Sequence, residues 1–378
     1  MNMAFHASMG QRIIKRTDVK TTFLVSRHKK LSAKLAPFGG WLMPIQYKGI
    51  IAEHNWTRNS CSLFDICHMG EFMIYGNPDE NNLGTVISTN LKSMGCGMCR
   101  YGFLLNEAGG IVDDLIIYKL KIDQWMMVVN AATISADLKY LQTYLSPEAK
   151  LENISSATAK LDLQGPLSRE VLQDLVGNDI NKLKYYTFGY FSLADEKIMI
   201  SRTGYTGELG YELYISAEKA GLVWDILLAD KRVEPAGLGA RDTLRLEMAY
   251  PLYGQDIDFF HTPEESDLLK FVDFDKDFIG KSSLLKKHHS GVKQSLCCFK
   301  VKSRRIPRHN YKIYKDSVEI GVVTSGSFSP SLLCGIGMGY INKEDNKIGQ
   351  RLLIKQENME IEAIIIDKPF YKKGSIKN

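Results

Sequence analysis

The fold class of this chain is decided at residues 109–120, where the sequence is Gly-Gly-Ile-Val-Asp-Asp-Leu-Ile-Ile-Tyr-Lys-Leu. The glycine pair indicates a turn, and the apolar run at 115–120 predicts a strand. The apolar segment 125–130 follows after four residues, so the two strands should form an antiparallel hairpin. Apolar residues then recur at spacings of four, three and four over 134–145, which predicts a helix with Thr133 as its N-cap.

Strands and helices alternate on both sides of this segment. Further strands are predicted at residues 71–75, 160–163, 197–202 and 211–215, and further helices after Pro166 and at 222–228 and 240–248. Beyond about Ser290, short strands separated by turns are predicted at 296–301, 311–314, 321–325, 337–341, 352–355 and 361–366. We therefore expect an α+β chain with a small all-β C-terminal domain that begins near residues 286–293.

Length and composition describe an ordinary globular chain of two or three domains. It has 378 residues, 44% of them hydrophobic and 24% charged, so disorder and coiled coil describe it poorly. The net charge of +5 is too small to indicate nucleic-acid binding, but it suits an acidic partner or an anionic small molecule. Seven cysteines argue against a secreted disulfide framework. No segment approaches the ~20 apolar residues of a membrane-spanning helix.

Two adjacent acids, Asp113 and Asp114, stand at the mouth of the predicted strand. Successive strand side chains point to opposite faces, so one of the pair should face inward. Burial or a substrate nitrogen would then tune its pKa. The alternative is a solvated turn.

A turn at residues 202–212 contains three glycines within seven residues, which let the backbone approach a flat ligand closely. Alternation places Glu212 and Tyr214 on one face of the strand that follows. A carboxylate there could accept two adjacent N–H groups of an amidine-like heterocycle. The alternative is a hairpin turn with an exposed glutamate.

Arg241 lies at the start of a predicted helix, where its charge is unfavourable to the helix dipole. A cation at this position suggests an anionic or carbonyl partner, and Arg245, one turn later, can share its face. The alternative is that either arginine pairs with Asp242 or Glu247.

Two short motifs carry little weight. The cysteines of Cys96-Gly97-Met98-Cys99 have no second pair at zinc spacing. The glycine-rich residues 335–339 precede a strand, so no helix N-terminus is available for a phosphate.

Together these segments resemble the T-protein of the glycine cleavage system, a family of tetrahydrofolate-dependent aminomethyltransferases. The resemblance runs from Thr21 to about Phe370. The motifs that carry it lie at residues 37–41, 43–47, 63–71, 106–110, 113–115, 163–166, 204–212, 240–247 and 324–330.

The resemblance implies a three-domain cloverleaf around a central folate site, with two mixed α/β domains and a small C-terminal β-barrel of jelly-roll type. The implied domains are a discontinuous folate-binding domain at 20–70 plus 156–250, an inserted domain with the Asp pair at 71–155 plus 251–290, the barrel at 291–378, and a basic N-terminal tail at 1–19.

The resemblance also implies the reaction. A one-carbon unit passes from an aminomethyl group on the lipoyl arm of the H-protein to tetrahydrofolate, giving 5,10-methylenetetrahydrofolate and ammonia. The family's key acid maps to Asp114, which would orient the amine and stabilise the positive charge that develops as ammonia departs. Its folate-binding glutamate and arginine match Glu212 and Arg241. Weaker folate candidates are Tyr118, Met69 and Tyr205. No metal is implied.

The chain departs from the family pattern in three places, one of which is Ser26, where an aspartate is usual before His28. A tail tyrosine that contacts ligand in some members corresponds to Ser375, so we expect no such contact here; Tyr371 is the nearest aromatic residue. A tryptophan of the family corresponds to Lys270 or Phe271. These changes could loosen packing or folate affinity.

Other functions share the implied fold. A non-catalytic folate-binding relative in iron–sulfur protein maintenance typically carries a Lys-Gly-Cys-Tyr-x-Gly-Gln-Glu turn, whereas residues 202–208 here are Arg-Thr-Gly-Tyr-Thr-Gly-Glu. The folate half of a sarcosine dehydrogenase would come with a flavin domain, for which this chain has no room. We therefore expect the enzyme, with the H-protein and folate as partners and with neither nucleic acid nor membrane.

Residues 1–17 contain three basic residues and no acid, which faintly resembles a mitochondrial transit peptide. The alternative is a short basic tail on a bacterial protein. We expect a bacterial cytoplasmic protein, with the mitochondrial matrix as the alternative location.

Overall fold

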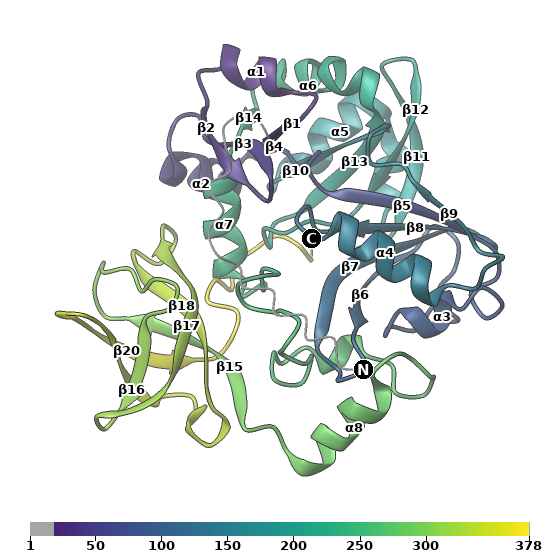
Figure 1. The fold of residues 1–378 in the computed structure, drawn as a ribbon. Helices are drawn as coiled ribbons and strands as arrows, with labels where there is room; N and C mark the ends of the chain where they lie inside the picture. The colour runs from purple at the N-terminus through teal and green to yellow at the C-terminus, as the bar shows by residue number, and fades with distance from the viewer. Residues whose placement is uncertain (1–18, 378) are drawn as a thin grey trace.

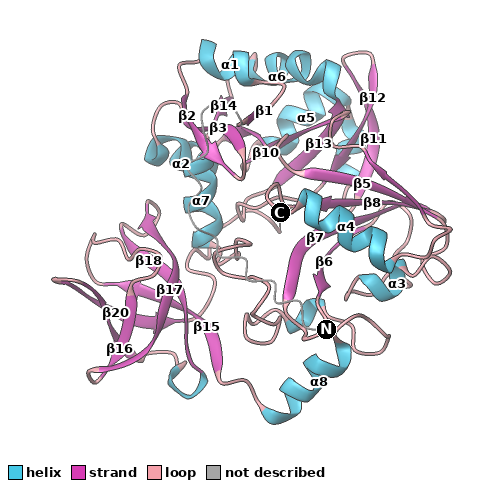
Figure 2. Ribbon diagram, viewed as in Figure 1, coloured by secondary structure: helices cyan, strands magenta, loops and turns pink. Residues whose placement is uncertain are grey.

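The computed structural model describes residues 19–377, whose strands form three open sheets and one closed barrel. In Figure 1 the barrel stands apart at the lower left, with the sheets above it and to its right. Figure 2 shows helices among the sheets of the two upper lobes, whereas the barrel is mainly strand. The predicted tail and transit peptide lie outside the described residues, apart from residue 19.

A small sheet and a six-stranded sheet form the upper lobe (Figure 1). The small sheet has the order β1-β3-β2, with strands β1 (Lys20–Thr21), β2 (Lys34–Phe38) and β3 (Trp41–Gln46). The larger sheet has the order β11-β12-β13-β10-β4-β14, with strands β4 (Cys61–Asp65), β10 (Thr158–Gln164), β11 (Phe188–Leu193), β12 (Glu196–Ser201), β13 (Gly210–Ser216) and β14 (Val233–Pro235). The helices of this part are α1 (Val25–Lys30), α2 (Ile50–Asn59), α5 (Ser168–Val176), α6 (Ala220–Leu228) and α7 (Leu238–Glu247).

Helices α5 and α6 join the core of the six-stranded sheet through adjacent apolar residues. Val171 and Leu172 of α5 and Val223 and Trp224 of α6 are all buried in this core. Leu175 and Leu227, three or four residues further on, reach the same core, so each helix presents one apolar face to the sheet.

The five-stranded sheet has the order β6-β7-β8-β5-β9 and grows out of the predicted hairpin. Its strands are β5 (Gly70–Tyr75), β6 (Cys99–Leu105), β7 (Ile111–Lys121), β8 (Gln124–Val129) and β9 (Lys150–Asn153). Helices α3 (Leu83–Val86) and α4 (Ile134–Tyr144) belong to this part, and α8 (Lys281–Ser290) leads to the barrel. Four short 3-10 helices are η1 (Asn178–Lys182), η2 (Ala217–Lys219), η3 (Leu269–Phe271) and η4 (Lys343–Asp345).

The C-terminal barrel closes in the strand order β15-β18-β17-β16-β19-β20, with every neighbouring pair antiparallel. Its strands are β15 (Gln294–Val301), β16 (Lys312–Lys315), β17 (Val318–Ser329), β18 (Cys334–Asn342), β19 (Arg351–Gln356) and β20 (Met359–Ile366). Phe299, Ile313 and Ile354 are fully buried inside it. Closure leaves no free strand edge, so this small domain needs no helix over its edges.

Helix α7 fastens the barrel to the rest of the chain through buried polar contacts. Arg245 of α7 is 1% exposed, pairs with Asp256 at 2.7 Å, and donates to Ser325 of β17 at 2.9 Å. Glu247 accepts a hydrogen bond from Ser329 of the same strand at 2.5 Å. These contacts explain why the motif at residues 324–330 is rich in hydroxyl groups.

The α+β fold class and the all-β C-terminal domain are confirmed. Strands β5 to β9 pair with one another and form the five-stranded sheet. In the sequence they lie between β4 and β10, which are neighbours in the six-stranded sheet. The residue bounds proposed for the domains stay a prediction. Thr133 precedes α4 as expected, but its hydroxyl makes no capping bond and donates to Asp113 at 2.8 Å instead.

Two glycines of the turn at residues 202–212 make room for the buried side chain of Gln164. A Cβ atom at Gly204 or Gly210 would lie 2.2 or 2.1 Å from the amide of Gln164. That amide is held in place, because its nitrogen donates to the Thr203 carbonyl at 3.1 Å and its oxygen accepts from Thr206 at 2.7 Å. Glycine is therefore required here by close approach.

We expect Gly210→Ala to lower the free energy of unfolding by about 1–3 kcal/mol, because the added methyl group must displace Gln164. Urea denaturation measures this. Gly95→Ala is the control, since its nearest neighbour would be Met98 Sδ at an ordinary 3.7 Å. Equal midpoints for the two variants would contradict the close packing.

Candidate active site between two sheets

One face of the five-stranded sheet carries the candidate site. Alternation along β7 puts Asp114 and Tyr118 on this face, and strand register adds Tyr101 of β6 and Glu71 of β5. The same face packs against the six-stranded sheet, where Tyr214 of β13 belongs to the shared apolar cluster. The site therefore lies between two sheets that are far apart in sequence.

Asp114 is half-buried and held by two hydrogen bonds. Tyr101 Oη donates to Oδ2 at 2.9 Å, and Asn130 Nδ2 donates to Oδ1 at 2.8 Å. Burial and the neighbouring Asp113 raise the pKa of Asp114 to about 7, against the opposing effect of these two bonds. The carboxyl can thus hold or release a proton near neutral pH.

Glu212 is buried but remains ionised. Its Oε1 pairs with Lys160 Nζ at 2.9 Å, and its Oε2 accepts from Thr203 Oγ1 at 2.5 Å. Burial alone would raise the pKa of Glu212, but Lys160 and Thr203 outweigh it, so the pKa is lowered. An ionised carboxylate with two oxygens is a strong acceptor for paired N–H donors.

Arg241 does not pair within its own helix. Its Nη1 donates to Asp162 of β10, and its guanidinium lies 4.9 Å from the centre of the Tyr205 ring. Of the alternatives left open by the sequence, local pairing holds only for Arg245, which contacts Asp242 at 2.8 Å.

The remaining candidates contact the same groups. Tyr118 is fully buried, hydrogen-bonds to Tyr214 Oη at 2.7 Å, and lies 3.4 Å from Glu212 Oε2. The sulfur of Met69 lies 3.6 Å from Lys160 Nζ. The ring of Tyr205 stacks on that of Tyr250, and the charge of Asp114 acts on its phenol.

The structure thus brings the six candidates into one region. Tyr205 is close to both charged groups, because its ring lies 4.9 Å from the Arg241 guanidinium and the charge of Asp114 acts on its phenol. Asp114 and Tyr118 are four residues apart on one strand, or about 13 Å at the usual rise. Glu212 contacts the side chain of Tyr118, which starts about that far along β7 from Asp114.

Several residues of this region carried no sequence motif. They are Tyr101, Asn130, Lys160 and Asp162. Glu71 and Thr203 lie within the motifs at residues 63–71 and 202–212 but were not expected to belong to the site. Lys160 offered one signal, because a lysine within a predicted strand must find a partner if that strand is buried. Glu71 is 1% exposed, and burial raises its pKa to about 8.

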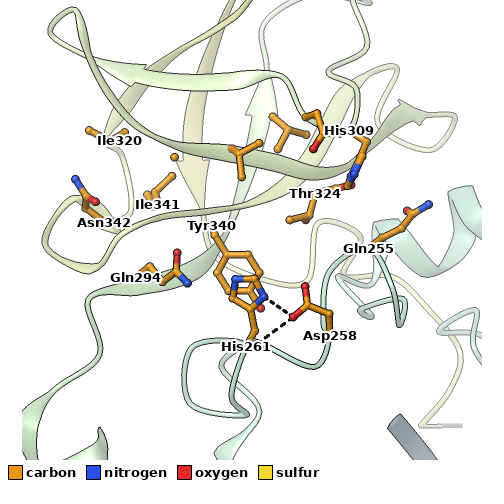
Figure 3. A pocket seen from close by; sticks show the side chains of 14 residues that line it. Gln255, Asp258, His261, Gln294, His309, Ile320, Thr324, Tyr340, Ile341 and Asn342 are labelled. Carbon is orange, nitrogen blue, oxygen red and sulfur yellow. Dashed lines mark hydrogen bonds and ion pairs between the residues drawn. The ribbon is translucent and has the colours of Figure 1, made fainter. Parts of the chain in front are cut away.

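A separate cavity of about 250 Å³ lies where the barrel meets residues 255–261 (Figure 3). His261 Nδ1 is hydrogen-bonded to Asp258 at 2.8 Å, and its ring stacks on Tyr340 at 3.8 Å. Asp114 and Glu212 do not line this cavity. Within residues 19–377, no group of three or more His, Cys, Asp or Glu side chains could hold a metal ion.

Comparison with known families accounts for both parts of the chain. The family model described as "GCVT N-terminal domain" matches residues 24–276, and "Glycine cleavage T-protein C-terminal barrel domain" matches residues 294–372. The chain belongs to the glycine cleavage T-protein family.

Curated relatives agree with this T-protein membership. An aminomethyltransferase of Halothermothrix orenii is 44% identical over 93% of this chain and 100% of its own length. One of Caldanaerobacter subterraneus is 40% identical over 94% and 97%. The crystal structure of glycine cleavage system aminomethyltransferase T from Bartonella henselae matches with a TM-score of 0.89 and 32% identity, covering 94% of this chain and 99% of that one. The non-catalytic alternative is not favoured.

The altered C-terminal tail of this T-protein docks on the glycine-rich turn. Ser375 Oγ donates to Glu208 Oε2 at 2.5 Å and accepts from the Leu209 amide at 2.9 Å. Tyr371 covers the guanidinium of Arg58 at 4.2 Å. The serine that replaces the family's tyrosine therefore makes contacts of its own.

Another altered position lies beside the candidate acid. Phe271 meets the ring of Tyr101 edge to face, with centroids 4.8 Å apart, and Tyr101 in turn donates to Asp114. An aromatic side chain thus still supports the tyrosine here.

We expect Glu71→Gln to remove a pH dependence of stability. Folded Glu71 keeps its proton until about pH 8, whereas the unfolded chain loses it near its ordinary pKa of 4.5. The folded state binds more protons between these values, so wild-type stability falls as pH rises through this window.

Urea unfolding from pH 5 to 9 measures this. The unfolding free energy of Glu71→Gln relative to wild type should rise with pH, approaching about 1.4 kcal/mol per pH unit, and level off above pH 8. The exposed Glu107→Gln is the control and should show no such trend. A flat difference for Glu71→Gln would mean that this carboxyl ionises normally.

Proposed function

We propose that this chain transfers a one-carbon unit from the aminomethyl group on a lipoylated H-protein to tetrahydrofolate, with release of ammonia. One observation carries the proposal: a proton-exchanging carboxyl, Asp114, and an ionised acceptor, Glu212, lie in one region between two sheets. The chain is similar over most of its length to aminomethyltransferases, which supports this reaction.

The residues of the site suit a reduced folate. Tetrahydrofolate supplies, when bound, the nitrogen nucleophiles that accept the one-carbon unit. Glu212 offers an anionic acceptor to the N–H groups of a pterin edge. Among the described residues, Glu71 Oε1 and His68 Nδ1 are buried without a hydrogen-bond partner, and both side chains feel the charge of Lys160. A ligand rich in N–H and C=O groups could satisfy both atoms.

Asp114 acts on the reacting nitrogens through position and charge. Tyr101 and Asn130 fix both oxygens, so the carboxyl needs no reorganisation when positive charge develops nearby. Its pKa of about 7 lets it take up or give back a proton during amine departure. Arg241 and Tyr205 would hold the ligand between this acid and Glu212.

The setting proposed for this reaction is the bacterial cytoplasm, supported by the bacterial relatives. None of the helices in the described part of the chain is long and apolar enough to cross a membrane.

Asp114→Asn should lose about 10²- to 10⁴-fold in turnover, because the amide cannot exchange a proton. The assay combines aminomethylated H-protein with tetrahydrofolate and follows ammonia release. Urea unfolding should confirm that the variant folds. Turnover close to that of the wild type would remove Asp114 from the mechanism.

Glu212→Gln should weaken tetrahydrofolate binding by about 10- to 100-fold, the cost of losing a hydrogen bond to a charged acceptor. Isothermal titration calorimetry measures the affinity. The double variant Lys160→Met/Glu212→Gln controls for the lysine left unpaired, since it should regain stability but not affinity. Normal binding by the double variant would refute the role of Glu212.

A further inference from the structure

Two buried carboxyl groups, Asp113 and Asp137, lie behind Asp114 on the other side of β7. Asp113 points to the opposite face of β7 from Asp114 and is fully buried beneath α4. Three donors reach it: the Asn130 backbone amide at 3.0 Å, Asn130 Nδ2 at 2.9 Å, and Thr133 Oγ1 at 2.8 Å. These bonds stabilise the ionised form of Asp113.

Asp137 of α4 is the other member of the pair. It is also fully buried, and it lies close enough to Asp113 for each carboxyl to shift the pKa of the other. Neither of its oxygens has a hydrogen-bond partner in the described chain, because the Thr133 hydroxyl, which also acts on Asp137, donates to Asp113. Within residues 19–377, no lysine, arginine or histidine forms an ion pair with Asp113, Asp114 or Asp137. Among the described residues, Asp114 and the phenol of Tyr253 are titratable groups that interact with the pair.

Two carboxylates in contact inside a protein cannot both be ionised without a cation. One proton must therefore lie between them, and the donors around Asp113 decide where. Asp113 is already saturated with donors, whereas Asp137 can satisfy itself only by donating. Asp137 is thus the protonated member, and the pair carries a single negative charge.

We propose that Asp113 and Asp137 share one proton and that the remaining charge, next to Asp114, sets the protonation of the catalytic carboxyl. The link is direct, because Asn130 Nδ2 donates to Asp113 Oδ1 at 2.9 Å and to Asp114 Oδ1 at 2.8 Å. Asp113, Asp137 and Asn130 are then positioning residues. The proposal rests on the role proposed above for Asp114.

Burial is not the only cause of the raised pKa of Asp114, because the neighbouring charge contributes as well. After burial, Asp113 is the second cause that raises the pKa of Asp114 to about 7. If both members of the pair were neutral, this contribution would vanish. If both were charged, Asp114 would hold its proton well above neutral pH and would exchange it poorly.

The shared proton is tested first by infrared spectroscopy on the full-length protein. Asp137→Asn is nearly isosteric, and its amide can donate to Asp113 as the acid did. The difference spectrum between wild type and this variant at pH 8 should contain the carbonyl stretch of a protonated carboxylic acid. Carboxylate bands alone in that difference would overturn the shared proton.

The influence on Asp114 is tested by the pH profile of kcat/KM in the ammonia-release assay. Asp137→Asn keeps one negative charge, so the midpoint near pH 7 should not move. Asp113→Asn/Asp137→Asn removes that charge, and the midpoint should fall by about 1 pH unit. If the double variant does not fold, Asp113→Asn alone should give part of this shift, since the charge then moves to α4.

An unshifted midpoint in every folded variant that lacks the Asp113 charge would overturn the influence on Asp114. If Asp114→Asn loses turnover but the midpoints of the Asp113 variants do not shift, only this inference is refuted. Full turnover in Asp114→Asn would refute the proposed function itself.

Discussion

Removal of water from between the two packed sheets is the constraint on which the site depends. Glu71, Asp114 and Glu212 are among the carboxyls at that interface, and burial raises the proton affinity of each. Their neighbouring residues then give these carboxyls different pKa values. Glu212 has Lys160 and Thr203 and stays ionised, whereas Asp114 has only neutral donors and titrates near pH 7. One dry interface thus supplies both an anionic acceptor and a proton-exchanging acid, the division of labour that acid–base sites require.

The two-residue period of β7 gives the adjacent acids different tasks. Asp114 faces the six-stranded sheet, whereas Asp113 faces α4, and Asn130 at the end of β8 reaches both. Because strand alternation is a property of the backbone, inserting or deleting one residue before Asp113 would exchange the two faces. The geometry of the acid is therefore built into the strand, and its charge environment comes from the helix behind.

Local patterns in the sequence predicted much of the fold and the ends of the site. The β7–β8 hairpin, helix α4 and the barrel strands follow from spacing and turns within about ten residues. Asp114 and Glu212 lie in short motifs, but their roles come from the family resemblance and stay predictions. Lys160 and Asn130 could not be found this way, because their partners come from strand register and from sheet packing. Lys160 meets Glu212 only because β10 pairs with β13, which lies about fifty residues later. The partner of Arg241 could not be found this way for the same reason, since Asp162 is on that strand.

The tail shows how a site can tolerate loss of an aromatic contact. Glu208 would be a buried, unpaired charge without partners, but Arg58 holds one of its oxygens and the backbone and hydroxyl of Ser375 hold the other. The tail thereby fixes the turn that presents Thr203 to Glu212. Serine at this position therefore contributes to the backbone that positions the carboxylate.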